Sequence, residues 1–366
     1  MLNINSKRES GIELLKILSI FAIILCHTYT NFTLAEDYTN SGQLFFDIVS
    51  FSNIEYFSFQ IIITFGYLCD IIFFVCTAWF LCDSKKHNNT KAINMIINTF
   101  ILSVLFLVIY KFLGFNISLE ETIKCLTPIS NGTYWYITCY IMFYLLSPYL
   151  NIIIDNLSKK QHLSICLVIF IIYYVIDFLA NSEFFYVNKL IMFAVMYFII
   201  SYIKKYHRDF CESLKLNIVL FIISTFIFYL IIFINYAIVP INLKWHVLYN
   251  PFFLMMAISL LNIFRKIKFS SKLINTLSAL TLFAYIIHSN PLFVDNTIIN
   301  LISKLLTNFG TNLIVIKVVA FALTLTVFSL LISYIYYLFT YKIVNKISNI
   351  IANLYDKFIR FIVKED

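Results

Sequence analysis

Charged residues are scarce in this sequence. They make up 13% of its 366 residues, whereas 61% are hydrophobic and the mean hydropathy is +0.86. A soluble domain carries about a quarter charged residues, so this composition excludes a soluble globular enzyme and a disordered chain. Glycine and proline are also rare, with six and five residues, which excludes collagen-like and low-complexity chains. The eight cysteines follow no metal-ligand or redox spacing and are interpreted as small packing residues. The remaining class is an integral membrane protein.

Long apolar segments recur along the whole chain. A transmembrane helix needs about 20 mostly apolar residues. Backbone polar groups must be paired in lipid, so each such segment is expected to be helical. The sequence therefore predicts an all-α integral membrane protein, a bundle of about ten transmembrane helices. The ten predicted spans cover residues 12–34, 57–82, 92–113, 134–154, 163–180, 185–203, 216–238, 247–264, 276–294 and 312–340.

The basic residues of the loops predict the orientation of these spans. With both termini in the cytoplasm, 21 of the 27 lysines and arginines lie on the inner side, as the positive-inside rule requires. The same residues account for the net charge of +8, so no nucleic-acid partner is implied. The six basic residues on the other side are Lys111, Lys124, Lys189, Lys244, Lys304 and Lys317.

Two regions are predicted: a transmembrane domain over residues 1–340, and a cytoplasmic tail over 341–366 that is basic and amphipathic. The tail carries Lys342, Lys346, Lys357 and Arg360 among isoleucine, leucine and phenylalanine residues. Such a pattern is typical of a helix that lies in the membrane interface. A solvated helix end is the alternative. The first apolar run is too long for a cleavable signal and is expected to be retained.

Ionisable side chains inside the bilayer are costly and therefore point to function. His27 and His288 fall within predicted spans, each toward the outer half. His87, His162 and His207 are expected in cytoplasmic loops among lysines, and His246 in an outer loop. A buried histidine is often a hydrogen-bonded packing residue, but two at similar depth favour a site.

The first span places a cation and an imidazole on one helix face. Eleven residues separate Lys16 from His27, so at about 100° per residue they end some 20° apart and about 16 Å along the axis. Glu13 can pair with Lys16 at i,i+3. Alternatively, Lys16 extends to the interface and Glu13 neutralises it, which leaves His27 unexplained.

Two further residues of the second span remain open. Asp70 is the only acidic residue in the middle of a predicted span. It could orient an imidazole, bind a cation, or accept hydrogen bonds from buried hydroxyls. With 25 tyrosines and 39 phenylalanines in the chain, a single aromatic residue such as Trp79 is interpreted as a packing or interface residue.

Four motifs in order along the chain resemble the acyltransferase 3 family of membrane acyltransferases. That family has a basic residue, ten intervening residues and then a histidine in its first helix, as Lys16 and His27 are spaced here. A Phe-rich helix, a Trp-led helix and a Tyr-Leu-Ile-His-x-x-Pro helix follow. The matching residues are 13–20 with His27, Phe73–Phe80, Trp135–Tyr140 with Leu145-Leu146-Ser147-Pro148, and Tyr285–Leu292.

The resemblance implies an enzyme that transfers an acyl group, usually acetyl, from cytoplasmic acyl-CoA to an acceptor, often a hydroxyl of a bacterial surface glycan. His27 would act as general base or carry the acyl group, Lys16 would hold an anionic part of the donor, and His288 would orient the acceptor or carry a second proton. Lys16, with Lys85 and Lys86, would bind acetyl-CoA, a donor substrate rather than a permanent cofactor. No metal is expected.

This sequence also departs from the family pattern. Lys16 stands where arginine is usual, and lysine cannot grip a phosphate in bidentate fashion. Thr77-Ala78 replaces Ser-Gly, and the usual arginine cluster after the second helix is reduced to Lys85, Lys86 and Lys91. The partners implied by the resemblance are the lipid bilayer, acyl-CoA and a saccharide acceptor, in a bacterial plasma membrane.

Two other functions remain open from the sequence. A transporter or flippase of a lipid-linked saccharide would use His27, Asp70 and His288 to line a polar path. It would move its substrate without depending on acyl-CoA. A structural or assembly protein would use His27 and His288 for stability alone.

Overall fold

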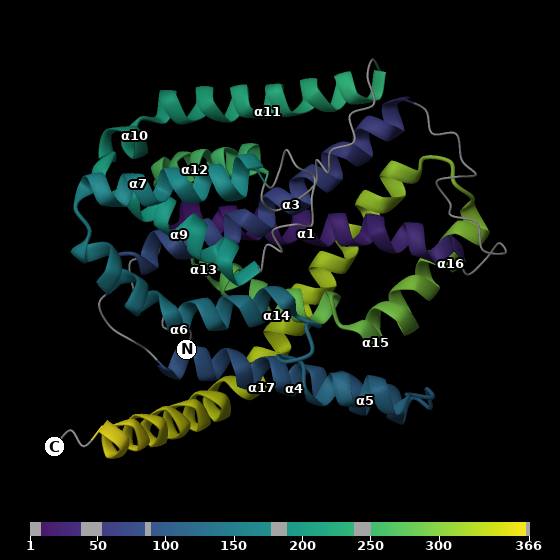
Figure 1. The fold of residues 1–366 in the computed structure, drawn as a ribbon. Coiled ribbons are helices and arrows are strands. Elements are labelled where there is room, and N and C mark those ends of the chain that lie inside the picture. The colour runs from purple at the N-terminus through teal and green to yellow at the C-terminus, as the bar shows by residue number, and fades with distance from the viewer. Residues whose placement is uncertain (1–8, 38–52, 85–88, 177–188, 238–249, 364–366) are drawn as a thin grey trace. The chain divides into compact units, whose positions relative to one another are not determined.

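The computed structural model describes residues 9–37, 53–84, 89–176, 189–237 and 250–363, and over these ranges it contains helices but no strands. Figure 1 shows the chain as a set of long helices joined by short connections. Lys85, Lys86, His87 and His246 lie outside the described residues.

The helices follow one another with few intervening residues. In chain order they are α1 (Ser10–Asp37), α3 (Asn53–Leu81), α4 (Asn89–Phe112), α5 (Leu119–Leu126), α6 (Trp135–Asn156), α7 (Lys159–Phe170), the π-helical η1 (Ile171–Ile176), α9 (Lys189–Tyr206), α10 (Arg208–Glu212), α11 (Leu214–Ala237), α12 (Pro251–Lys266), α13 (Lys272–Ala279), α14 (Thr281–His288), α15 (Pro291–Phe293), the π-helical η2 (Val294–Ile298), α16 (Ile299–Phe309) and α17 (Ile314–Val363).

Seven described helices are long and apolar enough to cross a membrane, against the ten spans that the sequence predicts. They cover Ser10–Phe32, Ile54–Leu81, Asn89–Phe112, Trp135–Asn156, Lys159–Ile176, Leu214–Ile234 and Ile314–Ile362. Over its described residues the chain is therefore all helical, with seven candidate membrane-spanning helices.

The other three predicted spans coincide with described helices that are shorter, broken or carry more charge than the seven. Helix α9 has lysines at both ends, and α12 is 16 residues long as described. The predicted span 276–294 is divided among α13, α14 and α15. Pro291 is the first residue of α15, a position that suits proline because the backbone N–H it lacks has no partner within a helix there.

The chain divides into two compact units, and the first contains Met1–His27, Phe51–Lys85 and Leu146–Ala279. Within it, α12 packs against α3 and α11, while α9 packs against α3 and α7. Gly11 lets α1 approach the end of α12, because a Cβ atom there would lie 2.1 Å from the carbonyl oxygen of Phe264. Hydrogen bonds then fix this end of α1 to α13, with the Ser10 hydroxyl donating to Asn275 Oδ1 over 3.0 Å.

Helices α1 and α3 of this unit run antiparallel in close contact. A Cβ atom at Gly66 would lie 2.3 Å from Cβ of Cys26, so only glycine fits at this crossing. Further along α3, Cys76 interacts electrostatically with Lys16 and Glu13 of α1. Residue numbers thus rise along one helix as they fall along the other, and Gly66 fixes the level at which the two helices touch.

The second unit contains Thr28–Ser50, Lys86–Leu145 and Leu280–Asp366. Within it, α17 packs against α4 and α14. Polar side chains join these helices inside the unit: Tyr336 Oη donates to Asn98 Oδ1 over 2.7 Å, and Asn94 Nδ2 donates to Asn345 Oδ1 over 2.7 Å. Asn98 and Tyr336 are buried, and Asn94 and Asn345 are half-buried, so each of these polar groups has a partner inside the unit.

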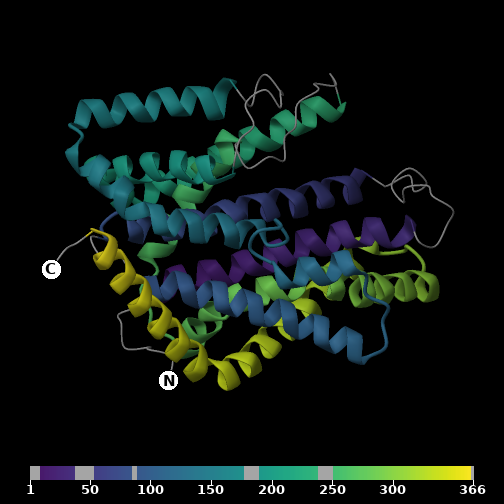
Figure 2. The ribbon, with the colours of Figure 1, turned by 60° about the horizontal axis from the view of Figure 1, so that its bottom comes forward.

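Helix α17 is too long to be a single membrane span. Its 50 residues extend about 75 Å, more than twice the ~30 Å hydrocarbon core. Figure 2 shows that it changes direction part-way along its length. The helix continues through residue 340 without a break, and Val344, Ser348 and Ala352 are buried at four-residue spacing along its C-terminal part. The boundary at 340 and the interfacial position of the tail stay predictions.

Candidate functional site

Helix α1 carries Lys16 and His27 without interruption between them. Both side chains are half-buried, and both belong to the first unit. Because the 28-residue helix is regular over this stretch, the separation of about 16 Å on one face follows from its geometry. The predicted site residues of this helix are therefore aligned as expected, while their chemical roles stay predictions.

Lys16 is partly neutralised by the partner expected from the sequence. Its Nζ atom lies 3.5 Å from Oε2 of Glu13, and the two side chains are 23% and 12% exposed. The same Glu13 oxygen accepts a hydrogen bond from the Ser278 hydroxyl of α13. The Glu13 carboxylate is thus held from two sides, by the Lys16 ammonium group and by the Ser278 hydroxyl.

His27 lies next to the tightest contact between α1 and α3. Cys26, the residue before it, packs on Gly66 of α3. Asp70 lies four residues further along α3, about 6 Å toward the end of that helix where Cys76 meets Lys16. Its carboxylate interacts electrostatically with Lys189 of α9. This half-buried aspartate therefore interacts with a cation on a third helix, and that cation is a lysine side chain of the protein itself.

His288 belongs to the second unit and is 1% exposed at the end of α14. Its Nδ1 atom lies 2.8 Å from the carbonyl oxygen of Ala284, and a carbonyl only accepts, so Nδ1 carries the proton. Its Nε2 atom then accepts from the Ser289 hydroxyl over 3.1 Å. A hydroxyl, an imidazole and an orienting acceptor thus stand in the order that activates a nucleophile.

The Asn290-Pro291 step that follows His288 is also fixed by hydrogen bonds. Asn290 is fully buried, caps α15 by accepting from the backbone N–H of Phe293, and donates through Nδ2 to Tyr134 Oη over 2.9 Å. These contacts fix the backbone that follows α14. His288 therefore lies between the helix before it and the capped turn after it.

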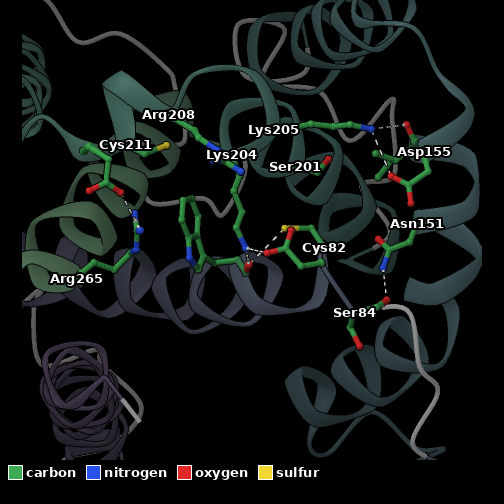
Figure 3. A pocket seen from close by; sticks show the side chains of 14 residues that line it. Cys82, Ser84, Asn151, Asp155, Ser201, Lys204, Lys205, Arg208, Cys211 and Arg265 are labelled. Atoms are coloured by element: carbon green, nitrogen blue, oxygen red, sulfur yellow. Dashed lines mark hydrogen bonds and ion pairs between the residues drawn. The ribbon is translucent and has the colours of Figure 1, made fainter. Parts of the chain in front are cut away.

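A cavity of about 670 Å³ opens at one end of the first unit. Figure 3 shows its lining side chains, which come from the ends of α3, α6, α9 and α12 and from α10. The end segments are 82–84, 154–155, 204–212 and the region of Arg265, and the sequence predicts all four on the cytoplasmic side. The structure therefore brings together, at one end of the unit, loops that the charge pattern places on one side of the membrane.

Trp79 forms a wall of this cavity between two cations. Lys204 Nζ lies 4.6 Å and the Arg265 guanidinium carbon 4.0 Å from the centre of its ring, within the range of cation–π attraction. Lys204 also donates to the carbonyl oxygen of Trp79 and, over 2.6 Å, to Oδ2 of Asp83. Trp79 is thus a buried residue of the cavity wall whose ring contacts two cationic side chains.

Acidic residues balance most of the cations around the cavity. Glu212 accepts from Lys266 and, over 3.2 Å, from Arg265 Nη2. The hydrogen bond from Lys266, supported by the charge of Arg265, holds the pKa of Glu212 below its usual range. Burial raises the pKa of the Cys211 thiol, so this cysteine stays protonated and is not a nucleophile at neutral pH.

One prediction from the sequence is wrong. His162 was expected in a loop among lysines, but it lies in α7 and is fully buried. Its Nε2 lies 3.0 Å from the carbonyl oxygen of Phe198, and its ring packs edge-on against Phe198 and Tyr202. The capping box of Ser158 and Gln161 begins α7 at Lys159, four residues before the predicted span at 163, so the buried His162 lies in the first turn of the helix.

Sequence reasoning did not identify the residues that form the cavity. Lys204, Arg208 and Arg265 were recognised only as loop charges, because no local motif links positions so far apart. The one available signal was their shared predicted side of the membrane. Among the described residues, no group of three or more His, Cys, Asp or Glu side chains could hold a metal ion.

The chain matches the family model for an acyltransferase domain, Acyl_transf_3, over residues 9–338. This match covers most of the sequence and includes Lys16, His27 and His288. The chain belongs to the acyltransferase 3 family. No curated protein and no solved structure matches it. As a member of the acyltransferase 3 family with membrane-spanning helices, the protein is a membrane acyltransferase.

Proposed function

We propose that this acyltransferase 3 family member transfers an acyl group, acetyl in the first instance, from cytoplasmic acyl-CoA to a hydroxyl of a cell-envelope saccharide in a bacterial plasma membrane. The observation that supports this is the unbroken α1 helix, which carries Lys16 and His27 on one face about 16 Å apart. A cation toward one end of a span and an imidazole deeper within it suit a donor that enters from one side.

His27 is the proposed general base. It removes the proton of the acceptor hydroxyl as the oxygen attacks the thioester carbonyl. A C–O bond forms, the C–S bond breaks, and the proton on the imidazolium passes to the leaving thiolate. If His27 instead carries the acyl group, its ring nitrogen attacks first and the acceptor hydroxyl displaces it in a second step. Both routes need an imidazole that exchanges a proton near neutral pH.

Lys16 and His288 have supporting roles in this proposal. Lys16 attracts an anionic part of the donor, with Lys85 and Lys86 as further donor contacts. His288 presents its ring from a rigid backbone and either orients the acceptor or carries a second proton, together with the Ser289 hydroxyl at 3.1 Å from its Nε2 atom.

The deciding experiment compares the O-acetyl content of surface glycans in four strains at equal protein levels. The strains carry wild-type protein, no protein, His27→Ala, or Leu18→Ala. Leu18 is a 47% exposed residue of the same helix and serves as the matched control. We expect acetyl esters to disappear without the protein and with His27→Ala only. If acetylation is unchanged in all four strains while glycan export fails in the deletion, the protein is a transporter instead.

A further inference from the structure

The side chains that line the cavity at the end of the first unit carry more positive than negative charge. Four cations line it (Lys204, Lys205, Arg208, Arg265), against three acids (Asp83, Asp155, Glu212), a net charge of 4 − 3 = +1. Two of the cations are committed to the structure, because Lys204 and Arg265 flank Trp79 and pair with Asp83 and Glu212. The remaining two are the ones available to a ligand.

Arg208 is the principal candidate. It begins α10, is exposed, and has no hydrogen bond or ion pair to any residue within the described ranges. Figure 3 shows it on the same side of the cavity as Lys204. Lys205, the second candidate, pairs loosely with Asp155: the atoms are 3.3 Å apart and the side chains are 38% and 61% exposed. Such an exposed pair contributes little and exchanges easily for a stronger anion.

The side chain of Arg265 in the cavity wall also has a hydrogen-bond donor without an acceptor among the described residues. The Nε atom of Arg265 is buried and has no hydrogen-bond partner among the described residues. A buried N–H group without a partner costs about 1–3 kcal/mol, more when charged, so such a group marks a place where an acceptor is missing. Its position beside Trp79 places this unsatisfied donor in the wall of the cavity that Arg208 also lines.

Helix α3 extends from the contact beside His27, past the level of Lys16, to the wall of the cavity. Lys16 meets α3 at Cys76, and Trp79 follows three residues later at the cavity wall. The 79 − 66 = 13 residues of α3 from Gly66, beside the residue before His27, to Trp79 extend about 20 Å. A donor held at the cavity must therefore reach along the Lys16 face of α1 to bring its reactive end to His27.

We infer that this cavity binds the phosphate groups of acyl-CoA through Arg208 and Lys205. The inference rests on the proposed function. Acyl-CoA carries its phosphates at one end and its thioester at the other end of a long flexible arm. This arrangement suits a cationic cavity that lies about 20 Å along α3 from Gly66, the contact of the residue before His27. Arginine suits this task, because its planar guanidinium forms two parallel hydrogen bonds to a phosphate. It would supply the bidentate contact that Lys16 cannot make.

The test measures binding of CoA to the full-length protein in nanodiscs of zwitterionic lipid by calorimetry. We compare wild type, Arg208→Gln, Lys205→Gln and Lys215→Gln. Lys215 is an exposed lysine at the start of α11, outside the cavity, and serves as the matched control. We expect the Kd for CoA to rise about 10-fold in Arg208→Gln and less in Lys205→Gln, with Lys215→Gln unchanged. An unchanged Kd in Arg208→Gln overturns the inference, as does an absence of CoA binding by the wild type.

Phospholipid headgroups offer the same phosphate chemistry, so a second arm repeats the titrations with phosphatidylglycerol in the nanodiscs and counts the lipids retained. If Arg208→Gln lowers lipid retention and leaves the Kd for CoA unchanged, the occupant is a lipid and the inference fails.

The measurement of glycan acetylation tests the proposed function separately from the cavity. Acetylation that depends on His27 but not on Arg208 leaves the proposed function intact. CoA binding that depends on Arg208, without any acetylation of glycans, leaves the cavity assignment intact and refutes the acceptor.

Discussion

His27 and His288 are both histidines of predicted membrane spans, but their surroundings differ. His27 lies half-buried in the middle of a regular helix, beside a contact made by Cys26 and Gly66. His288 is 1% exposed at the end of a short helix, with Nδ1 donating to Ala284 and Nε2 accepting from Ser289. The His288 ring is thus almost fully enclosed and held at both nitrogens, whereas the His27 ring is only partly buried.

This difference separates the two roles that a buried histidine can have. A ring held at both nitrogens has one tautomer and one orientation, which suits positioning and a fixed Ser–His pair. A half-exposed ring can meet a substrate directly, which suits proton transfer. In the proposed function His27 is the reacting imidazole and His288 has the supporting role, and each of the following changes tests one side of this proposal.

The largest effect is expected from His27→Ala. Loss of a general base lowers turnover by about 10²–10⁴-fold. Because the ring is half-buried, the thermal midpoint in nanodiscs should stay close to that of the wild type. The measurement is transfer of labelled acetyl from acetyl-CoA in membranes, normalised to protein. Activity within twofold of the wild type would show that His27 is not the base.

His288→Ala should act first on stability. Removing a fully buried side chain and its two hydrogen bonds costs about 2–4 kcal/mol, so the thermal midpoint falls and activity falls with it. Ser289→Ala is the matched control, because it removes one hydrogen bond and leaves the ring in place. If Ser289→Ala abolishes turnover at an unchanged midpoint, the Ser–His pair is itself catalytic and the assignment of roles is reversed.

Lys16 provides a smaller, charge-specific test of the α1 face. Replacing it by Gln should raise the KM for acyl-CoA about tenfold with little change in kcat, because a charge-assisted contact to the donor is lost. Lys16→Arg should retain or improve on the wild-type KM, since arginine is usual at this position in the family. Glu13→Gln controls for the ion pair. If the KM for acyl-CoA is the same in Lys16→Gln and wild type, Lys16 does not bind the donor and its role is to neutralise Glu13.

The smallest effect concerns pH and the cavity. The pKa of Glu212 is held below its usual range by Lys266 and Arg265, so its stabilising contribution is present above the pKa of the unfolded chain and is lost as pH falls through the lower folded pKa. The residue is 53% exposed, which limits the contribution to less than about 1 kcal/mol. The difference in thermal midpoint between wild type and Glu212→Gln should therefore be small at pH 7 and vanish on acidification. A difference that grows on acidification would contradict this ion pair.

Much of the fold follows from composition and periodicity. Scarce charge and long apolar runs predicted an all-helical membrane protein, and seven of the predicted spans coincide with described helices that are long and apolar enough to cross. The region 276–294 could not be predicted in detail, because its hydropathy resembles that of a span while its breaks depend on how Pro291 and Asn290 pack. His162 was misplaced for the same reason: neighbouring lysines suggest a loop, but a capping box makes the segment helical.

The sequence by itself determined the family of this protein, its membrane class and the alignment of Lys16 with His27, because helix geometry converts spacing directly into position. Only the tertiary structure decided which distant residues meet. The approach of α1 and α3 at Gly66, the hydrogen bonds that fix His288, and the cavity where Lys204 and Arg265 flank Trp79 depend on packing between segments far apart in the chain. No local pattern records such contacts, since they arise from complementary surfaces and paired charges rather than from the order of neighbouring residues.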